Sequence, residues 1–194
     1  MGNKTKDNNI VQIKITLLDT DPEIFRRVLV YANTPLADLH DVIQNAMGWE
    51  HDHLYHFIKD KVIYVQDDDT DFGLLMRDRV KSESEYTVDD LVPNVRAKFL
   101  YEYDFGDSWM HEVKREKFTQ AVTELQHPIC LEGQGACPPE DCGGVYGYYQ
   151  LLEVLADPKN PEYEESLEWF SDDFKPKYFD IDEANRKLKI IRYK

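Results

Sequence analysis

The chain has 194 residues, 42% of them hydrophobic, and 38 acidic against 23 basic residues give it a formal net charge of −15. A chain of this length can bury a core without disulfides or metal ions for bulk stability. Its 12 tyrosines, 9 phenylalanines and 3 tryptophans argue against disorder. The acidic balance repels phosphate, so general nucleic-acid binding and adhesion to anionic membranes are disfavoured.

Membrane insertion and secretion have no support in the sequence. No apolar run approaches the roughly 20 residues that span a bilayer. The polar stretch from Met1 to Asp7 does not resemble a signal peptide. An odd number of cysteines, 3, in such a chain indicates reduced thiols. We therefore expect a cytoplasmic protein with no membrane partner.

Alternating apolar residues predict strands in the first two thirds of the chain. Ile13, Ile15 and Leu17 alternate with polar residues, and after a turn cluster at 19–22 the β-branched stretch 24–31 completes a hairpin. Other strands are expected at 54–58, 62–65, 97–105 and 109–118, with a short helical turn at 88–91.

Residues 34–48 form the clearest predicted helix. Thr34 suits the N-cap and Pro35 the first helical position. Apolar residues then recur at helical spacing as far as Met47, and Gly48 is the expected stop.

The last third of the chain is predicted to be helical, after a loop rich in proline and glycine at 128–144. One helix covers 145–156 and a second follows Asn160-Pro161. A third opens at a capping box formed by Asp180 and Glu183.

Segregation of strands and helices along the chain predicts the fold class. Residues 8–118 are strand-rich and residues 145–190 are helical. We expect one α+β domain over residues 1–194, in which a mainly antiparallel sheet packs against helices.

Candidate catalytic and metal-binding groups surround the tip of the predicted hairpin 97–118. Asp104, Asp107 and His111 combine carboxylates with an imidazole, which suits zinc, iron or manganese as well as acid–base chemistry. The alternative is purely structural, because Gly106 relieves the bend and Asp107 can bond its own backbone in an Asx-turn.

Strict alternation in this hairpin predicts which side chains share a face. Tyr101, Tyr103 and Phe105 would lie on one side of the sheet, and Glu102 and Asp104 on the other.

The segment His51-Asp52-His53-Leu54-Tyr55-His56 offers three imidazoles. If it is extended, His51 and His53 share one strand face and His56 lies on the other. His53 is the candidate metal ligand, although the segment lacks the spacing of a zincin motif. Exposed loop histidines are the alternative interpretation.

The segment Cys137-Pro138-Pro139-Glu140-Asp141-Cys142-Gly143-Gly144 predicts a rigid, irregular loop. Cys137 and Cys142 are candidate metal ligands, but the spacing Cys130-x6-Cys137-x4-Cys142 is not that of a structural zinc site. Packing as small hydrophobic residues is the alternative for these thiols.

The two carboxylates of this loop are candidate acid–base groups. Glu140 and Asp141 could act in catalysis, or could instead place negative charge at the N-terminus of the helix that starts near Val145.

Arg26, Arg27 and Trp109 are the candidate ligand-binding residues. The adjacent arginines could clamp an anion. Ion pairing with neighbouring carboxylates is the alternative in so acidic a chain. The sequence contains no P-loop, dinucleotide fingerprint or nucleophile elbow, so nucleotide-dependent and serine-hydrolase chemistry have no local support.

Several segments together resemble the plasmid pRiA4b ORF-3-like family. They are Pro22-x-Ile24-x-Arg26-Arg27, Leu39-His40, Ala46-Met47-Gly48-Trp49, His53-Leu54, Tyr103-Asp104-Phe105-Gly106-Asp107-Ser108-Trp109-x-His111 and Cys137-Pro138-Pro139-Glu140-Asp141-Cys142-Gly143-Gly144, with Phe179 and Asn185 beyond them. They also follow one another in the order found in the family.

The resemblance implies an α+β, cytoplasmic, prokaryotic protein and brings no established activity. A link of some relatives to plasmids or mobile elements hints at an accessory role near DNA. One departure concerns the histidines: the family pattern tends to read His-Leu-His-x-Phe, whereas this chain reads His53-Leu54-Tyr55-His56-Phe57.

Two functions follow as hypotheses. The first is a module that binds a protein or a small-molecule ligand without turnover. The alternative is a metal-dependent, hydrolase-like enzyme, for which the one suggested cofactor is a divalent transition metal. In that case a group of ionisable side chains would converge: His53, Asp104, Asp107, His111, Glu140 and Asp141.

Overall fold

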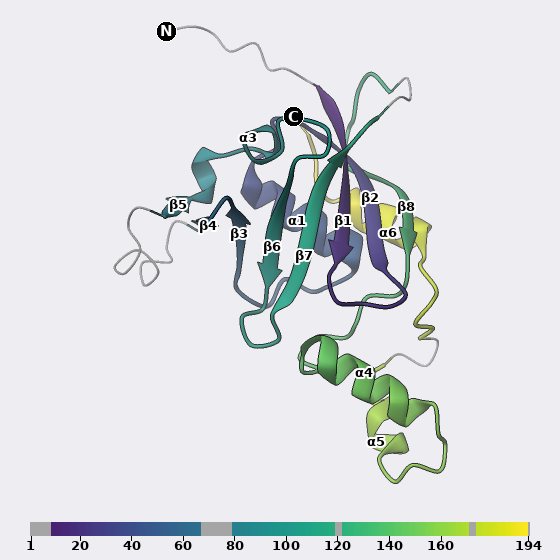
Figure 1. The fold of residues 1–194 in the computed structure, drawn as a ribbon. Helices are drawn as coiled ribbons and strands as arrows, with labels where there is room; N and C mark the ends of the chain where they lie inside the picture. The colour runs from purple at the N-terminus through teal and green to yellow at the C-terminus, as the bar shows by residue number, and fades with distance from the viewer. Residues whose placement is uncertain (1–8, 67–78, 119–121, 171–173, 194) are drawn as a thin grey trace, which may run out of the picture.

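The computed structural model describes residues 9–66, 79–118, 122–170 and 174–193, which form one eight-stranded sheet with helices against it (Figure 1). The strand order is β5-β4-β3-β6-β7-β1-β2-β8. All neighbouring strands are antiparallel except β4 and β5. The predicted α+β class with a mainly antiparallel sheet is confirmed.

The centre of the sheet follows the alternation in the sequence. Four neighbouring strands lie between β3 and the edge strand β8: β6 (Lys98–Tyr103), β7 (Trp109–Glu116), β1 (Ile10–Leu17) and β2 (Ile24–Tyr31). Every second residue of β1 is buried, because only one face of the strand points into the main core.

Three shorter strands extend the sheet beyond β6, and two short helical segments follow them along the chain. They are β3 (Tyr55–Lys59), β4 (Val62–Val65), β5 (Val80–Ser82), the 3-10 turn η1 (Glu83–Glu85) and α3 (Val88–Leu91). The predicted helical turn at 88–91 is thus present. His51 and His53 precede β3 in a loop, so they do not share a strand face as the H-x-H spacing suggested.

The opposite edge of the sheet is a strand that the sequence did not predict. β8 (Ile129–Gln134) pairs with β2 inside the segment expected to be a loop. Its Gly133 is explained by packing, because a Cβ atom there would lie 2.4 Å from the ring of Phe179. The absence of a side chain at Gly133 therefore leaves room for the Phe179 ring to pack on the strand.

Helix α1 (Leu36–Met47) lies across one face of the sheet, beside α6 (Ile181–Leu188) (Figure 1). The N-cap of α1 is Pro35, one residue later than predicted. Gly48 ends the helix as expected, with φ of 120° and its N–H donating to the Gln44 carbonyl at 2.8 Å.

The main core lies between the sheet and α1. It consists of apolar and aromatic side chains with no measurable exposure, among them Ile13, Leu39, Ile43, Phe57, Tyr101 and Trp109. Helices α4 (Gly144–Leu155) and α5 (Tyr163–Leu167) lie beyond one end of the sheet (Figure 1). Across the described ranges, none of the helices is long and apolar enough to cross a membrane.

Candidate functional site

Three loops meet at the end of the sheet nearest α4: residues 48–54, 104–108 and 135–143 (Figure 1). Hydrogen bonds join them. The Trp49 indole Nε1 donates to the Pro138 carbonyl at 3.1 Å, and the Gly143 N–H donates to Asp107 Oδ2 at 3.1 Å. The three sequence segments with most ionisable groups therefore converge at this end.

His53 lies at the centre of a group of carboxylates, which we call the His53 cluster (His53, Asp104, Glu140 and Asp141). Its Nε2 is 3.3 Å from Asp141 Oδ1 and 3.8 Å from Glu140 Oε2. Its Nδ1 is 3.8 Å from Asp104 Oδ2. One ligand atom each from His53, Asp104 and Asp141 lie within 4.8 Å of one another, as in sites that hold a metal ion.

Two aspartates of the cluster have unusual backbone conformations. Asp104 has φ of 57° and Asp141 has φ of 54°, in the left-handed region that few side chains adopt. At Asp104 this breaks the alternation of the hairpin. Asp104 is buried near His53, while Phe105 packs on His56 with ring centroids 4.9 Å apart. The predicted sharing of faces therefore fails after Tyr103.

Glu140 is fixed through one carboxylate oxygen only. Oε1 accepts hydrogen bonds from the Glu50 N–H at 3.0 Å and the Tyr103 hydroxyl at 3.1 Å. Oε2 is buried without a hydrogen-bond partner in the described part of the chain. Burial raises the pKa of Glu140 above its ordinary value. This free oxygen faces His53.

Asp107 supports the site rather than joining it. Its Oδ2 accepts the Gly143 N–H, and a Cβ atom at Gly144 would lie only 2.4 Å from the Asp107 carbonyl oxygen. Asp107 therefore ties the 104–108 turn to the start of α4. The expected Asx-turn is made by Asp104, whose Oδ1 accepts the Gly106 N–H at 2.9 Å.

His111 and Trp109 belong to the core. Both have no exposed surface, and His111 Nδ1 lies 3.0 Å from the Trp109 carbonyl oxygen. Burial lowers the pKa of His111 to about 3, so the ring is neutral at pH 7. The structure thus places neither the proposed ligand His111 nor the proposed binding residue Trp109 at the cluster.

The cysteines also lie outside it. Within the described ranges, neither Cys137 nor Cys142 belongs to a group of three side chains suited to a metal ion. Burial raises the pKa of Cys142 to about 12 and that of Cys137 further. Both are therefore thiols at neutral pH and pack as small apolar groups.

The adjacent arginines have different roles. Arg27 pairs with Glu116 at 2.8 Å and Glu132 at 2.6 Å on the sheet surface. Arg26 is 1% exposed and donates to four backbone carbonyls, three at 2.8–2.9 Å and one at 3.4 Å. The ion pairing expected for the two holds for Arg27 alone.

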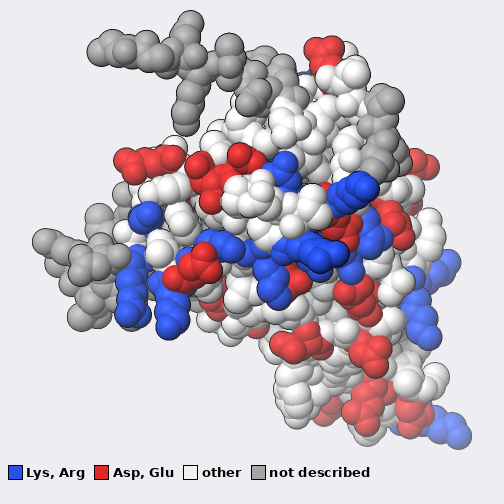
Figure 2. Space-filling view, turned by 45° about the horizontal axis from the view of Figure 1, so that its top comes forward, with Lys and Arg blue, Asp and Glu red and all other residues white. Residues whose placement is uncertain are grey.

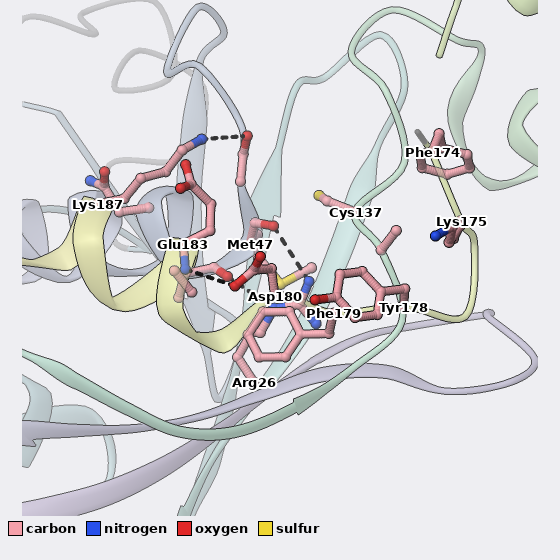
Figure 3. Close-up of a pocket in the computed structure, with 15 residues that line it drawn as sticks. Arg26, Met47, Cys137, Phe174, Lys175, Tyr178, Phe179, Asp180, Glu183 and Lys187 are labelled. Atoms are coloured by element: carbon pink, nitrogen blue, oxygen red, sulfur yellow. Dashed lines mark hydrogen bonds between the residues drawn. The ribbon is translucent and has the colours of Figure 1, made fainter. Parts of the chain in front are cut away.

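Arg26 forms part of a pocket of about 410 Å³ between α1, α6 and the segment before α6 (Figure 3), here called the Arg26 pocket. The Phe179 ring covers the guanidinium at 3.9 Å. Lys175 and Lys187 also line the pocket, together with Asp180 and Glu183. Burial lowers the pKa of Arg26 to about 10, so it is charged at pH 7.

A second histidine group was not predicted: His40, Asp41 and His51, with ligand atoms within 4.8 Å. The His40 ring stacks on Tyr55 at 3.6 Å, and its Nδ1 lies 2.8 Å from the Tyr101 hydroxyl. His40 lies on α1, whereas His51 lies in the following loop with a left-handed φ of 68°. The fold brings them together, so no spacing pattern in the sequence reveals this group.

Hydrogen bonds around Tyr101 disfavour metal binding by His40. Gln44 accepts the His51 N–H through Oε1, so its Nε2 donates to the Tyr101 hydroxyl at 3.0 Å. The Tyr101 hydroxyl keeps its own proton to donate, and His40 Nδ1 at 2.8 Å is its acceptor in the described chain, which places the imidazole proton on Nε2. A protonated Nε2 has no lone pair for a metal, so we interpret this group as structural.

The open face of the sheet carries a row of basic residues. The register aligns one from each of four neighbouring strands: Lys98, Lys114, Lys14 and Arg27. Figure 2 shows basic side chains gathered in a band with acidic ones on both sides. Ion pairs of 2.5–2.8 Å to glutamates neutralise three members of the row. The row therefore lacks the excess positive charge that a phosphate backbone requires.

Comparison with known proteins identifies the family. Residues 9–183 match the model of the plasmid pRiA4b ORF-3-like protein family. The chain is 40% identical over 163 residues to "Uncharacterized protein y4hQ" of Sinorhizobium fredii, covering 83% of this chain and 80% of that protein.

A solved structure shares the fold. It is the "Protein of Unknown Function MM3350" from Methanosarcina mazei Go1, with a TM-score of 0.75 and 35% sequence identity. The match covers 89% of this chain and 96% of that one. Neither relative is described with a specific activity. The chain belongs to the plasmid pRiA4b ORF-3-like family.

Proposed function

We propose that the protein binds one divalent transition metal ion at the His53 cluster and uses it in hydrolase-like chemistry. The observation that carries this proposal is that His53 Nε2 lies close to two carboxylate oxygens, Asp141 Oδ1 at 3.3 Å and Glu140 Oε2 at 3.8 Å. Two ligand atoms about 2.1 Å from a tetrahedral zinc ion lie about 3.4 Å apart, so the spacing of His53 Nε2 and Asp141 Oδ1 suits a shared metal, with Glu140 Oε2 near the same nitrogen.

The remaining carboxylate fits a supporting role. Asp104 Oδ2 lies 3.8 Å from His53 Nδ1. Metal-binding histidines commonly donate their other N–H to a carboxylate, which fixes the tautomer and the ring orientation. In this arrangement His53, Glu140 and Asp141 hold the ion, and Asp104 positions the imidazole.

The solvent side of the cluster is open. The side chain of Asp141 is 69% exposed, whereas those of Asp104 and Glu140 are 10% and 20% exposed. Three protein ligands with an open position are typical of catalytic metal sites, where a bound water becomes a nucleophile near neutral pH. One imidazole with carboxylates suits zinc, manganese or iron.

Metal analysis of the protein purified without chelator tests this function. We expect about one zinc, manganese or iron ion per chain by mass spectrometry, lost on His53→Ala and kept on His127→Ala. His127 is the matched control because it lies outside the His53 cluster and its Nδ1 is 2.8 Å from the neighbouring Pro128 carbonyl oxygen. A metal-free wild-type protein that also fails to bind added Zn²⁺ or Mn²⁺ would overturn the proposal.

A second candidate function is binding of a small anion without turnover, and the Arg26 pocket favours it. In the described ranges no carboxylate lies within ion-pair distance of the buried Arg26 guanidinium, and two lysines line the same pocket. Titration with sulfate tests it. Sulfate binding to the wild type that weakens on Lys175→Gln supports this function. If calorimetry detects no sulfate binding to the wild type or to the variant, the result counts against it.

A further inference from the structure

A second pocket, of about 400 Å³, adjoins the His53 cluster and shares Glu140 with it. Its walls come from the 48–54 loop, the Cys137 loop and the segment after α5. We call it the acidic aromatic pocket, and its lining includes Trp49, Glu50, Glu140, Glu168, Trp169 and Phe170.

The charged side chains that line this pocket are acidic. Glu50, Glu140 and Glu168 line it, and no lysine or arginine is among its described lining residues. One of the Glu140 oxygens is buried and accepts no hydrogen bond from the described chain. Glu50 and Glu168 are exposed and Glu140 is half-buried, and three carboxylates around one pocket give it a negative potential that attracts a cation.

The other walls are aromatic and apolar. Phe170 and Phe174 pack with ring centroids 4.2 Å apart, and Trp169 is 43% exposed. Pro138 and Pro139 add apolar surface beside them. Aromatic faces attract cations through the ring quadrupole, and tryptophan does so best.

We propose that the acidic aromatic pocket binds an organic cation, an alkylammonium group on an apolar body. Its substrate role rests on the proposed function, because the shared Glu140 places the bound molecule next to the metal. Binding of the cation itself needs only the pocket. Anionic and phosphorylated compounds are excluded by the same three carboxylates.

A pair of probes of equal shape tests the charge preference. Choline and its neutral analogue 3,3-dimethylbutan-1-ol would be titrated into the protein while tryptophan fluorescence and heat are recorded. We expect choline to bind at least about fivefold more tightly, as cation–π and carboxylate attraction predict. Equal affinities for the two probes, or binding of neither, would overturn the proposal.

Two variants locate the site. Glu168→Gln and Trp169→Ala change exposed side chains, so the fold is retained, and each should weaken choline binding by about threefold or more. Glu164→Gln, on α5 but outside the pocket lining, is the matched control for loss of one charge. A choline affinity that is unchanged in both the Glu168→Gln and the Trp169→Ala variants would contradict the assignment.

The same proteins separate this inference from the proposed function. Glu168→Gln should bind Zn²⁺ as the wild type does, because Glu168 lies outside the His53 cluster. Choline binding without metal binding would leave the pocket assignment standing and reject the metal function. Metal binding without choline binding would support the metal function and reject the pocket assignment.

Discussion

His53 Nε2 lies 3.3 Å from Asp141 Oδ1, although the two residues belong to loops far apart in the chain. The contact joins separate segments that carry the resemblance to the family. His53-Leu54, the turn containing Asp104 and the loop containing Asp141 each supply one member of a single cluster. Asp104 and Asp141 both hold left-handed backbones there, a form of strain that concentrates at functional sites.

Glu140→Gln should stabilise the metal-free protein while it weakens metal binding. Glutamine keeps an acceptor for the Glu50 N–H and the Tyr103 hydroxyl, and it removes a partly buried charge. The pKa of Glu140 is raised in the fold, so its ionised form opposes folding at neutral pH. We expect a gain of up to about 1 kcal/mol in urea unfolding at pH 7.

This gain should vanish as the pH falls. Below the raised pKa, Glu140 takes up a proton in the folded state and no longer differs in charge from glutamine. Glu164→Gln, an exposed control on α5, should show no gain in the free energy of unfolding at pH 7 or below the raised pKa of Glu140. A Glu140→Gln protein less stable than the wild type at pH 7 would show that the carboxylate is a net stabiliser.

Asp104→Asn separates positioning from folding. Asparagine tolerates the left-handed backbone and can still accept the Gly106 N–H, so stability should change by less than about 1 kcal/mol. Loss of the charge behind His53 Nδ1 should reduce metal affinity about 10- to 100-fold. Isothermal titration with Zn²⁺ measures this, and unchanged affinity would remove Asp104 from the supporting role.

The adjacent arginines should respond differently to the same change. Arg26→Lys cannot reach four carbonyls with one ammonium group, so we expect a loss of about 2–4 kcal/mol in the free energy of unfolding. Arg27→Lys loses only a surface pair network, which is worth about 1 kcal/mol or less. Equal losses in denaturant unfolding would contradict the structural assignment of Arg26.

Two buried histidines predict loss of stability in acid. Burial lowers the pKa of His40 and of His111 to about 3. Between that value and the unfolded value near 6.5, the unfolded chain binds protons that the folded chain does not. Stability should therefore fall as the pH decreases from about 6.5, by about 1.4 kcal/mol per pH unit for each histidine.

His40→Gln checks this assignment. The variant should lower the proton uptake on unfolding at pH 5 by about one proton relative to the wild type, as measured from the pH dependence of urea unfolding. An unchanged uptake would mean that His40 is already charged in the fold.

Much of the fold could be predicted from local patterns. Alternation located β1, β2, β6 and β7, and Gly48 ended α1 where expected. β8 was missed because Gly133 reads as a loop residue, whereas its missing side chain makes room for Phe179. That reason is a tertiary contact, which no local pattern contains.

The candidate site was predictable at the level of loops and not of side chains. His53, Asp104, Glu140 and Asp141 were all among the candidates, and the structure brings them together. His111 and Asp107 shared their segment, but strand alternation buries His111 and a hydrogen bond to Gly143 occupies Asp107. The difference between Arg26 and Arg27 likewise depends on which strand face meets α1.

Locating the metal ion directly tests the central claim. A crystal grown with Zn²⁺ would be measured with X-rays above and below the zinc absorption edge. We predict one anomalous peak among His53 Nε2, Asp141 and Glu140, about 2.0–2.2 Å from its ligand atoms. A peak at His40 and His51 instead, or no peak at the His53 cluster, would contradict the account.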